Sequence, residues 1–300
     1  MRLGFVGIGT MGAPIARRLV DAGHDVHVVD PVPLALRGLV DHGATAADDA
    51  ALSASGADAV FLSLPGPQEV RAVVVGDGGV LQAEARPRFV VDLSTNSPDV
   101  VRELAAACRD AGVTFVDAPV SGGAAKALTG ELSVMVGASE ADHAEIEPLL
   151  SAFAAVVFRV GETGAGTVAK LVNNQLFLGA AVIVQEAYLL AAAHGLAPTE
   201  LHPIIKASSG GSYAALAPLL LGRQFDDVVF RLDIAAKDLA LAVAAADAAG
   251  VAMPVTAAAA GVYADAVEDG FGRLVFHAAL KELEQRSGIE VPALVRRRPA

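Results

Sequence analysis

A lysine and two amides stand together in one apolar stretch of the sequence. Residues 164–174 read GAGTVAKLVNN, so Lys170 and Asn174 share one face of a helix, with Asn173 beside them. Burying an ammonium group is costly unless it serves a purpose. Hydride delivery to a carbonyl leaves an alkoxide, which such a group can protonate. We therefore interpret Lys170 as a general acid/base, and a lysine that extends to solvent from the first exposed turn is the structural alternative.

A second polar group ends in a turn of small residues. Residues 117–123 read DAPVSGG and follow a predicted strand. Backbone amides in such a turn can point at an anion. Ser121, Gly122 and Gly123 are therefore expected to hold the carboxylate of a substrate, with help from the serine hydroxyl. Asp117 is expected to cap or brace the turn itself.

The amino end carries a glycine pattern typical of dinucleotide-binding turns. Residues 7–12 read GIGTMG and lie between a predicted strand and a predicted helix. Gly7 permits a tight turn, Gly9 lets a pyrophosphate approach the backbone, and Gly12 lets helix and strand pack closely. The predicted cofactor-binding turn is completed by Ile8, Thr10 and Met11. A glycine-rich turn that binds no nucleotide is the alternative.

An acidic residue follows at the spacing that such a turn requires. Asp30 lies 18 residues after Gly12, at the end of the next predicted strand. A carboxylate there accepts hydrogen bonds from the adenosine ribose and repels a 2′-phosphate. NAD is therefore expected in preference to NADP, although Arg37 is close enough in the sequence to change that preference.

Two further loops follow predicted strands at the sheet edge where open α/β sheets bind ligands. Leu64 and Pro65 begin the first loop, which we interpret as a wall of the adenosine pocket. Thr95 lies in the second, residues 94–98, which we interpret as a partner of the nicotinamide ribose. Each segment taken alone is also compatible with an ordinary loop.

The candidate site residues fall in two predicted domains, one built on a β-sheet and one built of helices. Residues 1–162 alternate short apolar runs with helical segments, which predicts a doubly wound, parallel α/β sheet of the Rossmann type. Strands are predicted at 3–8, 25–29, 59–64, 89–93, 114–116, 132–136 and 156–160. Residues 163–300 lack strand signals and predict an all-helical domain, whose first helix covers about 166–194. Its later helices are expected to be separated near 195–198, 208–212, 250–254 and 269–272.

The composition and net charge exclude several classes of protein. The 300 residues are 54% hydrophobic and 19% charged, which predicts a globular fold rather than a disordered chain. The net charge of −12 argues against nucleic acid and membrane surfaces as partners. The chain enters a strand at once, and its lone cysteine, Cys108, is expected to be a small buried residue. We therefore expect a cytoplasmic protein.

Other ionisable residues carry no functional prediction. The histidines, His277 among them, lack the spacing of metal ligands and are expected in ordinary surface or helix-end roles. No metal site is predicted. The basic end, with Arg296, Arg297 and Arg298, is expected to be a solvated tail.

Four stretches together resemble the β-hydroxyacid dehydrogenases, a family that includes 3-hydroxyisobutyrate dehydrogenases and tartronate semialdehyde reductases. They are residues 4–12 (GFVGIGTMG), 117–123 (DAPVSGG), 164–174 (GAGTVAKLVNN) and 237–242 (KDLALA). The resemblance covers nearly the whole chain. It implies a Rossmann domain before an all-helical domain, hydride transfer between a nicotinamide cofactor and a small 3-hydroxy acid or its semialdehyde, and a homodimer or homotetramer.

The resemblance also implies roles for single residues. Lys170 would be the catalytic acid/base, and Asn174 would orient it and the substrate. Phe230 and Lys237 would close over the nicotinamide end of the cofactor. Substrate contacts from the helical part would come from Asn173, Asn174, Phe230 and Asp238.

Two other functions on this fold stay open at this point. Imine reductases resemble the family but typically replace the lysine, and some non-catalytic dinucleotide-binding modules have lost it, so Lys170 argues against both. Lys126 resembles the tartronate semialdehyde reductase branch more than the 3-hydroxyisobutyrate branch. Gly123 stands where relatives acting on sulfonated aldehydes have arginine, which disfavours a sulfonate substrate.

Overall fold

The computed structural model describes residues 1–294, so the predicted basic tail at Arg296, Arg297 and Arg298 lies outside the described part. The chain divides into two compact units. One is Met1–Lys170, here called the Rossmann unit, and the other, the helical unit, begins at Leu171. The division falls inside a long helix. The predicted boundary between residues 162 and 163 lies before that helix and stays a prediction.

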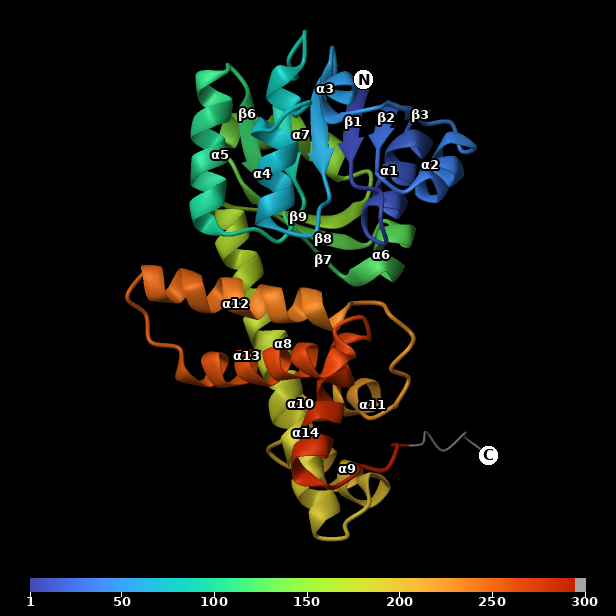
Figure 1. Cartoon of the computed structure of the whole chain (residues 1–300), viewed down its shortest axis with the longest axis vertical. Helices are drawn as coiled ribbons and strands as arrows, with labels where there is room; N and C mark the ends of the chain where they lie inside the picture. Colours follow the sequence, from blue (N-terminus) through green and yellow to red (C-terminus); the bar gives the residue numbers. More distant parts are fainter. Residues whose placement is uncertain (295–300) are drawn as a thin grey trace. The chain divides into compact units, whose positions relative to one another are not determined.

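A mostly parallel sheet forms the centre of the Rossmann unit (Figure 1). Its parallel part has the order β3-β2-β1-β4-β5-β6. These strands are β1 (Arg2–Val6), β2 (Asp25–Val29), β3 (Thr45–Ala46), β4 (Ala59–Leu62), β5 (Phe89–Asp92) and β6 (Thr114–Asp117). The doubly wound architecture predicted from the alternating pattern is confirmed.

The sheet continues past β6 with a change of direction. β8 runs antiparallel to β6 and β7, and β9 is parallel to β8. These strands are β7 (Val120–Ser121), β8 (Leu132–Gly137) and β9 (Ala154–Gly161). All seven predicted strands are present. β3 and β7 were not predicted, because two residues are too few to show an apolar alternation.

Helices cover both faces of this sheet. Alternate residues of β1 separate the two apolar clusters: Leu3 and Phe5 pack with α1, whereas Val6 packs on the other side with α4 and α5. Cys108 is buried on that second side as predicted, and burial raises the pKa of its thiol to about 12. The helices are α1 (Gly12–Asp21), α2 (Pro33–Val40), α3 (Ala50–Ala54), α4 (Pro67–Val75), α5 (Pro98–Asp110), α6 (Gly123–Thr129) and α7 (Glu140–Leu150), with the 3₁₀ turn η1 (Val80–Gln82).

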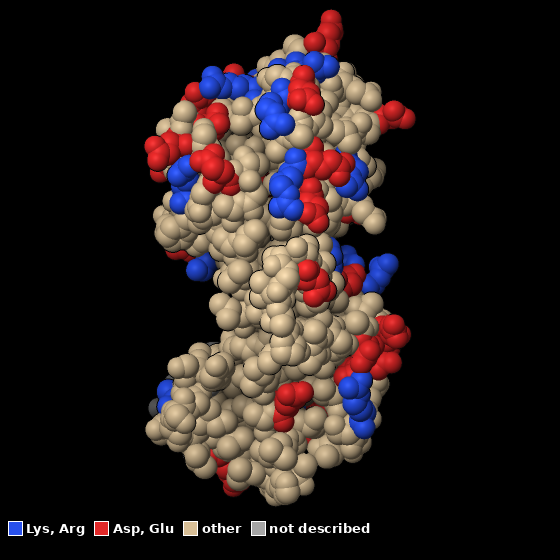
Figure 2. Space-filling model, turned by 90° about the vertical axis from the view of Figure 1, so that its left-hand side faces the viewer, with Lys and Arg blue, Asp and Glu red and all other residues tan. Residues whose placement is uncertain are grey.

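The helical unit is built on α8 (Ala165–Ala193), which begins and ends within one residue of its predicted bounds. Its buried side chains include Leu178, Val182 and Tyr188, and they join the apolar core of the unit. α8 is long and apolar enough to cross a membrane, and the core helices of globular proteins share both properties. In Figure 2 charged side chains gather over the Rossmann unit, while the visible face of the helical unit is largely uncharged.

The remaining helices of this unit are separated where glycine, serine and proline predict breaks. They are α9 (Pro198–Ala207), α10 (Gly211–Ala214), α11 (Ala217–Leu220), α12 (Leu232–Ala248), α13 (Pro254–Ala266) and α14 (Ala279–Ser287), with the short turns η2 (Val267–Phe271) and η3 (Phe276–Ala278).

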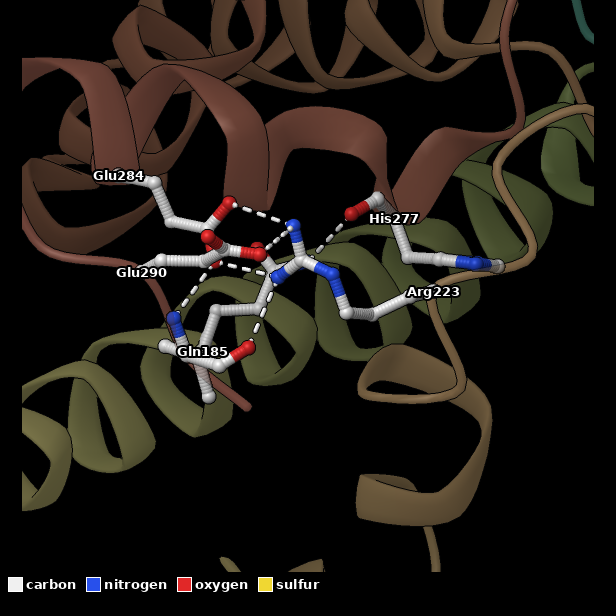
Figure 3. A network of polar contacts seen from close by, with 6 residues as sticks. Gln185, Arg223, His277, Glu284 and Glu290 are labelled. Carbon is white, nitrogen blue, oxygen red and sulfur yellow. Dashed lines mark hydrogen bonds and ion pairs between the residues drawn. The ribbon is translucent and has the colours of Figure 1, made fainter. Parts of the chain in front are cut away.

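An ion-pair network joins the end of the described chain to the rest of the helical unit (Figure 3). Arg223 Nη1 donates to Glu284 Oε1 at 2.6 Å and to the carbonyl of Val291 at 2.8 Å, and Arg223 Nη2 lies 3.1 Å from Glu290 Oε1. The backbone of Arg223 is left-handed, with φ +54°. A non-glycine residue adopts that conformation only where its surroundings favour it. The guanidinium contacts supply that support.

Candidate active site

The turn between β1 and α1 is shaped by close backbone packing. A Cβ on Gly7, whose φ is +90°, would lie 2.3 Å from the carbonyl oxygen of Ser63. One on Gly12 would lie 1.9 Å from the carbonyl oxygen of Gly7. Nothing lies within 4 Å of a Cβ on Gly9. Glycine is therefore required at both ends of the turn, and its middle is open to an approaching phosphate.

Asp30 joins this turn to the end of β2. Its Oδ2 accepts the backbone N–H of Ile8 at 2.9 Å, and its Oδ1 accepts that of Val32 at 2.9 Å. Each carboxylate oxygen keeps a second lone pair. The side chain can therefore hold the turn and still accept hydrogen bonds from ribose hydroxyls. The sequence predicts the second capacity but does not show the bond to Ile8.

A buried carboxylate organises the two neighbouring loops. Asp92, 1% exposed at the end of β5, accepts the Ser94 N–H at 3.0 Å and the Asn96 Nδ2 at 2.9 Å. Ser94 Oγ in turn accepts the N–H of Leu64 at 2.9 Å. The loops that carry Leu64, Pro65 and Thr95 are thus held together from one side chain. Sequence reasoning missed Asp92, although an acidic residue ending the apolar run FVVDL was a usable signal.

Asp117 ends β6 and is also buried, at 1% exposure. Its Oδ1 accepts the N–H of Gly164 at 2.6 Å, and its Oδ2 accepts the N–H of Thr167 at 2.7 Å. The carboxylate therefore caps α8, some fifty residues later, which the sequence did not indicate. The expectation that Asp117 caps or braces its own turn stays a prediction. Burial raises the pKa of Asp117 to about 6, against the opposing effect of these two hydrogen bonds.

The small-residue turn follows Asp117 directly. Ser121 lies in β7 and pairs with Ser133 of β8. Gly122 and Gly123 have φ angles of +131° and +73°, which side chains rarely adopt, and α6 begins there. The stem of Lys126 lies over this turn, since a Cβ on Gly122 would be 2.8 Å from its Cδ.

Lys170 lies on α8, half-buried, in the second turn of the helix. Asn174 follows it by one helical turn, as the spacing predicts, and is buried. Both positions therefore share one face of a helix whose first turn is bonded to Asp117.

In the helical unit a chain of polar contacts runs from α8 to α12. Asn174 Nδ2 donates to Asp238 Oδ2 at 2.6 Å, and Asn174 Oδ1 accepts from Asn173 Nδ2 at 3.2 Å. Lys237 Nζ lies 2.7 Å from Asp238 Oδ1, so an ammonium and an amide balance this buried carboxylate. The structure thus brings together four predicted residues of this unit. Asn174 and Asp238 lie more than sixty residues apart, so the sequence gave no local signal of the bond between them.

Phe230 stands two residues before α12, the helix that carries Lys237 and Asp238. Its ring packs against Phe276 with centroids 5.8 Å apart, and its carbonyl oxygen accepts the N–H of Phe276 at 2.7 Å. Its predicted place over the nicotinamide stays a prediction. Among residues 1–294, no group of three or more His, Cys, Asp or Glu side chains is arranged to hold a metal ion.

Two family models match the chain. The NAD binding domain of 6-phosphogluconate dehydrogenase matches residues 2–161, and a model described as the NAD-binding part of NADP-dependent 3-hydroxyisobutyrate dehydrogenase matches residues 164–283. The 2-(hydroxymethyl)glutarate dehydrogenase of Eubacterium barkeri is 37% identical over 97% of both chains. The NAD-dependent L-serine dehydrogenase of Pseudomonas aeruginosa is 35% identical over 96% of this chain and 99% of that protein.

A solved structure is similar over the same extent. The 3-hydroxyisobutyrate dehydrogenase of Mycobacterium tuberculosis, determined with L-serine, has a TM-score of 0.84 and 33% identity. The match covers 94% of this chain and 98% of that one. The likeness therefore extends through both units.

Proposed function

The chain belongs to the β-hydroxyacid dehydrogenase family, which its four motifs predict, and on that premise we propose how its residues carry out the reaction. It is an oxidoreductase that transfers hydride between a nicotinamide cofactor and a small 3-hydroxy acid or its semialdehyde. We assign the proton transfer to Lys170. The observation that carries this assignment is its place: a half-buried amine in the second turn of α8, in the same unit as the Ser121–Gly123 turn.

The residues of the chain divide the work. The Ser121 hydroxyl and the amides of Gly122 and Gly123 hold the substrate carboxylate. When bound, the nicotinamide cofactor accepts or supplies the hydride. During oxidation the neutral Lys170 amine takes the proton of the substrate hydroxyl, and during reduction the Lys170 ammonium returns a proton to the carbonyl oxygen. Asn174, fixed by Asp238, orients that exchange.

The substrate class follows from the relatives. Their names include 2-(hydroxymethyl)glutarate, 3-hydroxyisobutyrate and L-serine. In each of these compounds one carbon, C2, carries both the carboxylate and a CH2OH group. The compounds differ in the further substituent on C2. We propose the same arrangement for this chain. Lys126, whose stem lies against Gly122, also brings a positive charge to this part of the chain, and that charge favours a polar or anionic substituent.

The cofactor is NAD, and Asp30 supports a preference for it over NADP. Its carboxylate is held beside the glycine turn by Ile8 and Val32, where a 2′-phosphate would meet a negative charge. The single reduced cysteine, Cys108, supports a cytoplasmic location, which remains a proposal.

We also propose that the chain forms a homodimer or homotetramer. Leu176, Ile183 and Leu190 of α8 are 67%, 48% and 65% exposed and lie at seven-residue intervals, so they form one apolar stripe. Large apolar residues in such a stripe favour packing against another helix. Sedimentation of the wild-type protein should give a dimer or tetramer, and Leu176→Glu should shift it toward the monomer. A monomeric wild type would refute this proposal.

The activity is tested by following nicotinamide absorbance with purified protein. The panel contains primary 3-hydroxy acids, their semialdehydes and one cyclic imine, each with both cofactors. We expect turnover of a 3-hydroxy acid with NAD and none of the imine. Lys170→Met should bind NADH normally while its turnover falls by at least ~10²-fold, the range for loss of a general acid. A near-normal rate would remove the assigned role of Lys170.

A further inference from the structure

The start of α8 lacks a capping side chain of its own. Gly164 precedes the first helical residue, Ala165, so the residue at the N-cap position has no side chain that could accept the N–H groups of the first turn. An acceptor comes from β6, where the Asp117 carboxylate accepts the N–H of Gly164, just before the helix, and the N–H of Thr167 in its first turn. Its negative charge also lies at the positive end of a 29-residue helix. α8 is therefore attached to the sheet through Asp117.

Two glycines bring the helix into backbone contact at the same place. A Cβ on Gly166 would lie 2.3 Å from the carbonyl oxygen of Met135 in β8 and 2.6 Å from that of Asp117. One on Gly137, the last residue of β8, would lie 2.3 Å from Asp117 Oδ1. At Gly166, therefore, no side chain separates the backbone of α8 from that of β6 and β8. The position of its first turn is consequently set by these strands within narrow limits.

The same strands carry the turn that is proposed to hold the substrate carboxylate. β8 donates from the N–H of Met135 to the carbonyl of Pro119 at 3.1 Å and pairs through Ser133 with Ser121. Lys170 stands three residues after Thr167, less than one turn from the bond to Asp117. Contacts with the end of β6 and with β8 thus position both Lys170, the proposed acid/base, and the Ser121–Gly123 turn.

We propose that Asp117 is a positioning residue: by bonding the first turn of α8 it fixes Lys170 relative to the Ser121–Gly123 turn, and it thereby sets the rate of proton transfer without contacting substrate. The proposal rests on the assigned role of Lys170. The energetic cost of burying Asp117 supports the proposal. Burial raises the pKa of this carboxyl to about 6, so the two hydrogen bonds to the start of α8 are formed at the expense of its solvation.

The test is a double-mutant cycle in the full-length protein. Asp117→Asn keeps the size of the side chain but loses the charge and one of its two acceptors. We expect kcat to fall by ~10- to 10²-fold, the loss that a displacement of about 1 Å can cause. KM for NAD should stay within about twofold. In a Lys170→Met background the same substitution should change the residual rate by less than about twofold, because the residue it positions is absent.

Control variants separate positioning from general loss of stability. Asp49→Asn makes the same change of charge at the cap of α3, where Asp49 Oδ1 accepts the N–H of Leu52 at 2.7 Å, and it should leave kcat unchanged. If Asp117→Asn does not fold, Gly166→Ala displaces the first turn sterically with Asp117 intact. It should lower kcat in the same way and with the same dependence on Lys170.

Each outcome of the cycle decides. An equal loss of rate with and without Lys170 would overturn the positioning role while leaving the role of Lys170 intact. An unchanged kcat in both Asp117→Asn and Gly166→Ala would overturn it as well. A Lys170→Met variant with normal turnover would refute the acid/base assignment itself, and with it the inference.

Discussion

Acid should destabilise the helical unit through one buried histidine. His277 is 4% exposed, both of its ring nitrogens lack a hydrogen-bond partner among the described residues, and its ring lies against Phe225 and Phe276. Figure 3 shows the ring pointing away from Glu284 and Glu290. Burial lowers the pKa of His277 from 6.5 to about 4. The expected surface or helix-end role of this histidine is therefore corrected to that of a neutral core residue.

The sign and size of the effect follow from linkage. Between pH 6.5 and 4 the unfolded chain binds a proton at His277 that the folded chain refuses, so stability is present above pH 6.5 and lost as the pH falls toward 4. A shift of about 2.5 units corresponds to ~3 kcal/mol in full, of which ~2 kcal/mol is lost by pH 5. Asp117 acts in the opposite sense in the Rossmann unit, because its pKa is raised.

The assay compares variants, so the opposite contribution of Asp117 cancels. Urea unfolding is followed by far-ultraviolet circular dichroism at pH 7 and pH 5 for the wild type and for His277→Leu. The leucine keeps the backbone carbonyl that accepts from Gln185. We expect the variant to lose ~2 kcal/mol less between the two pH values. His194→Leu, at an exposed position, is the matched control and should behave as the wild type. Equal losses in the wild type and His277→Leu would refute the reasoning.

Three further changes have defined outcomes. Arg223→Ala leaves Glu284, a nearly buried carboxylate, without its guanidinium, so urea unfolding should show the helical unit destabilised by ~2 kcal/mol; a change below ~0.5 kcal/mol would contradict the network. Asp30→Asn should lower the ratio of kcat/KM for NAD to that for NADP by ~10-fold, and an unchanged ratio would exclude Asp30 from cofactor choice. Gly12→Ala should abolish NADH binding in a fluorescence titration, whereas Gly38→Ala, with open space around its Cβ, should not.

Much of the fold could be predicted because its signals are local. Parallel strands buried on both faces read as continuous apolar runs, and α8 begins and ends within one residue of the predicted bounds. The antiparallel pairing of β8 could not be predicted, since register and direction depend on contacts between distant strands. β7 has two residues and no periodicity at all.

The candidate site divides in the same way. Gly7, Gly12 and Asp30 follow a spacing that reflects one βαβ unit, so the sequence alone places them. The role of Asp117 at α8 was missed because its bonds run to backbone N–H groups about fifty residues later. Asp92 was missed although its partners, Ser94 and Asn96, stand in the loop that follows it. The bond between Asn174 and Asp238 likewise joins two helices far apart in the chain.

Because α8 belongs in part to each unit, it limits where this chain can be joined to the chain of a relative. A crossover at residue 162 would take α8 from one parent and Asp117, with the neighbouring Gly137, from the other. Chimeras should therefore inherit residues 117–137 and 164–170 from the same parent, as a single cassette. A library built on crossovers after residue 193 would keep that cassette whole.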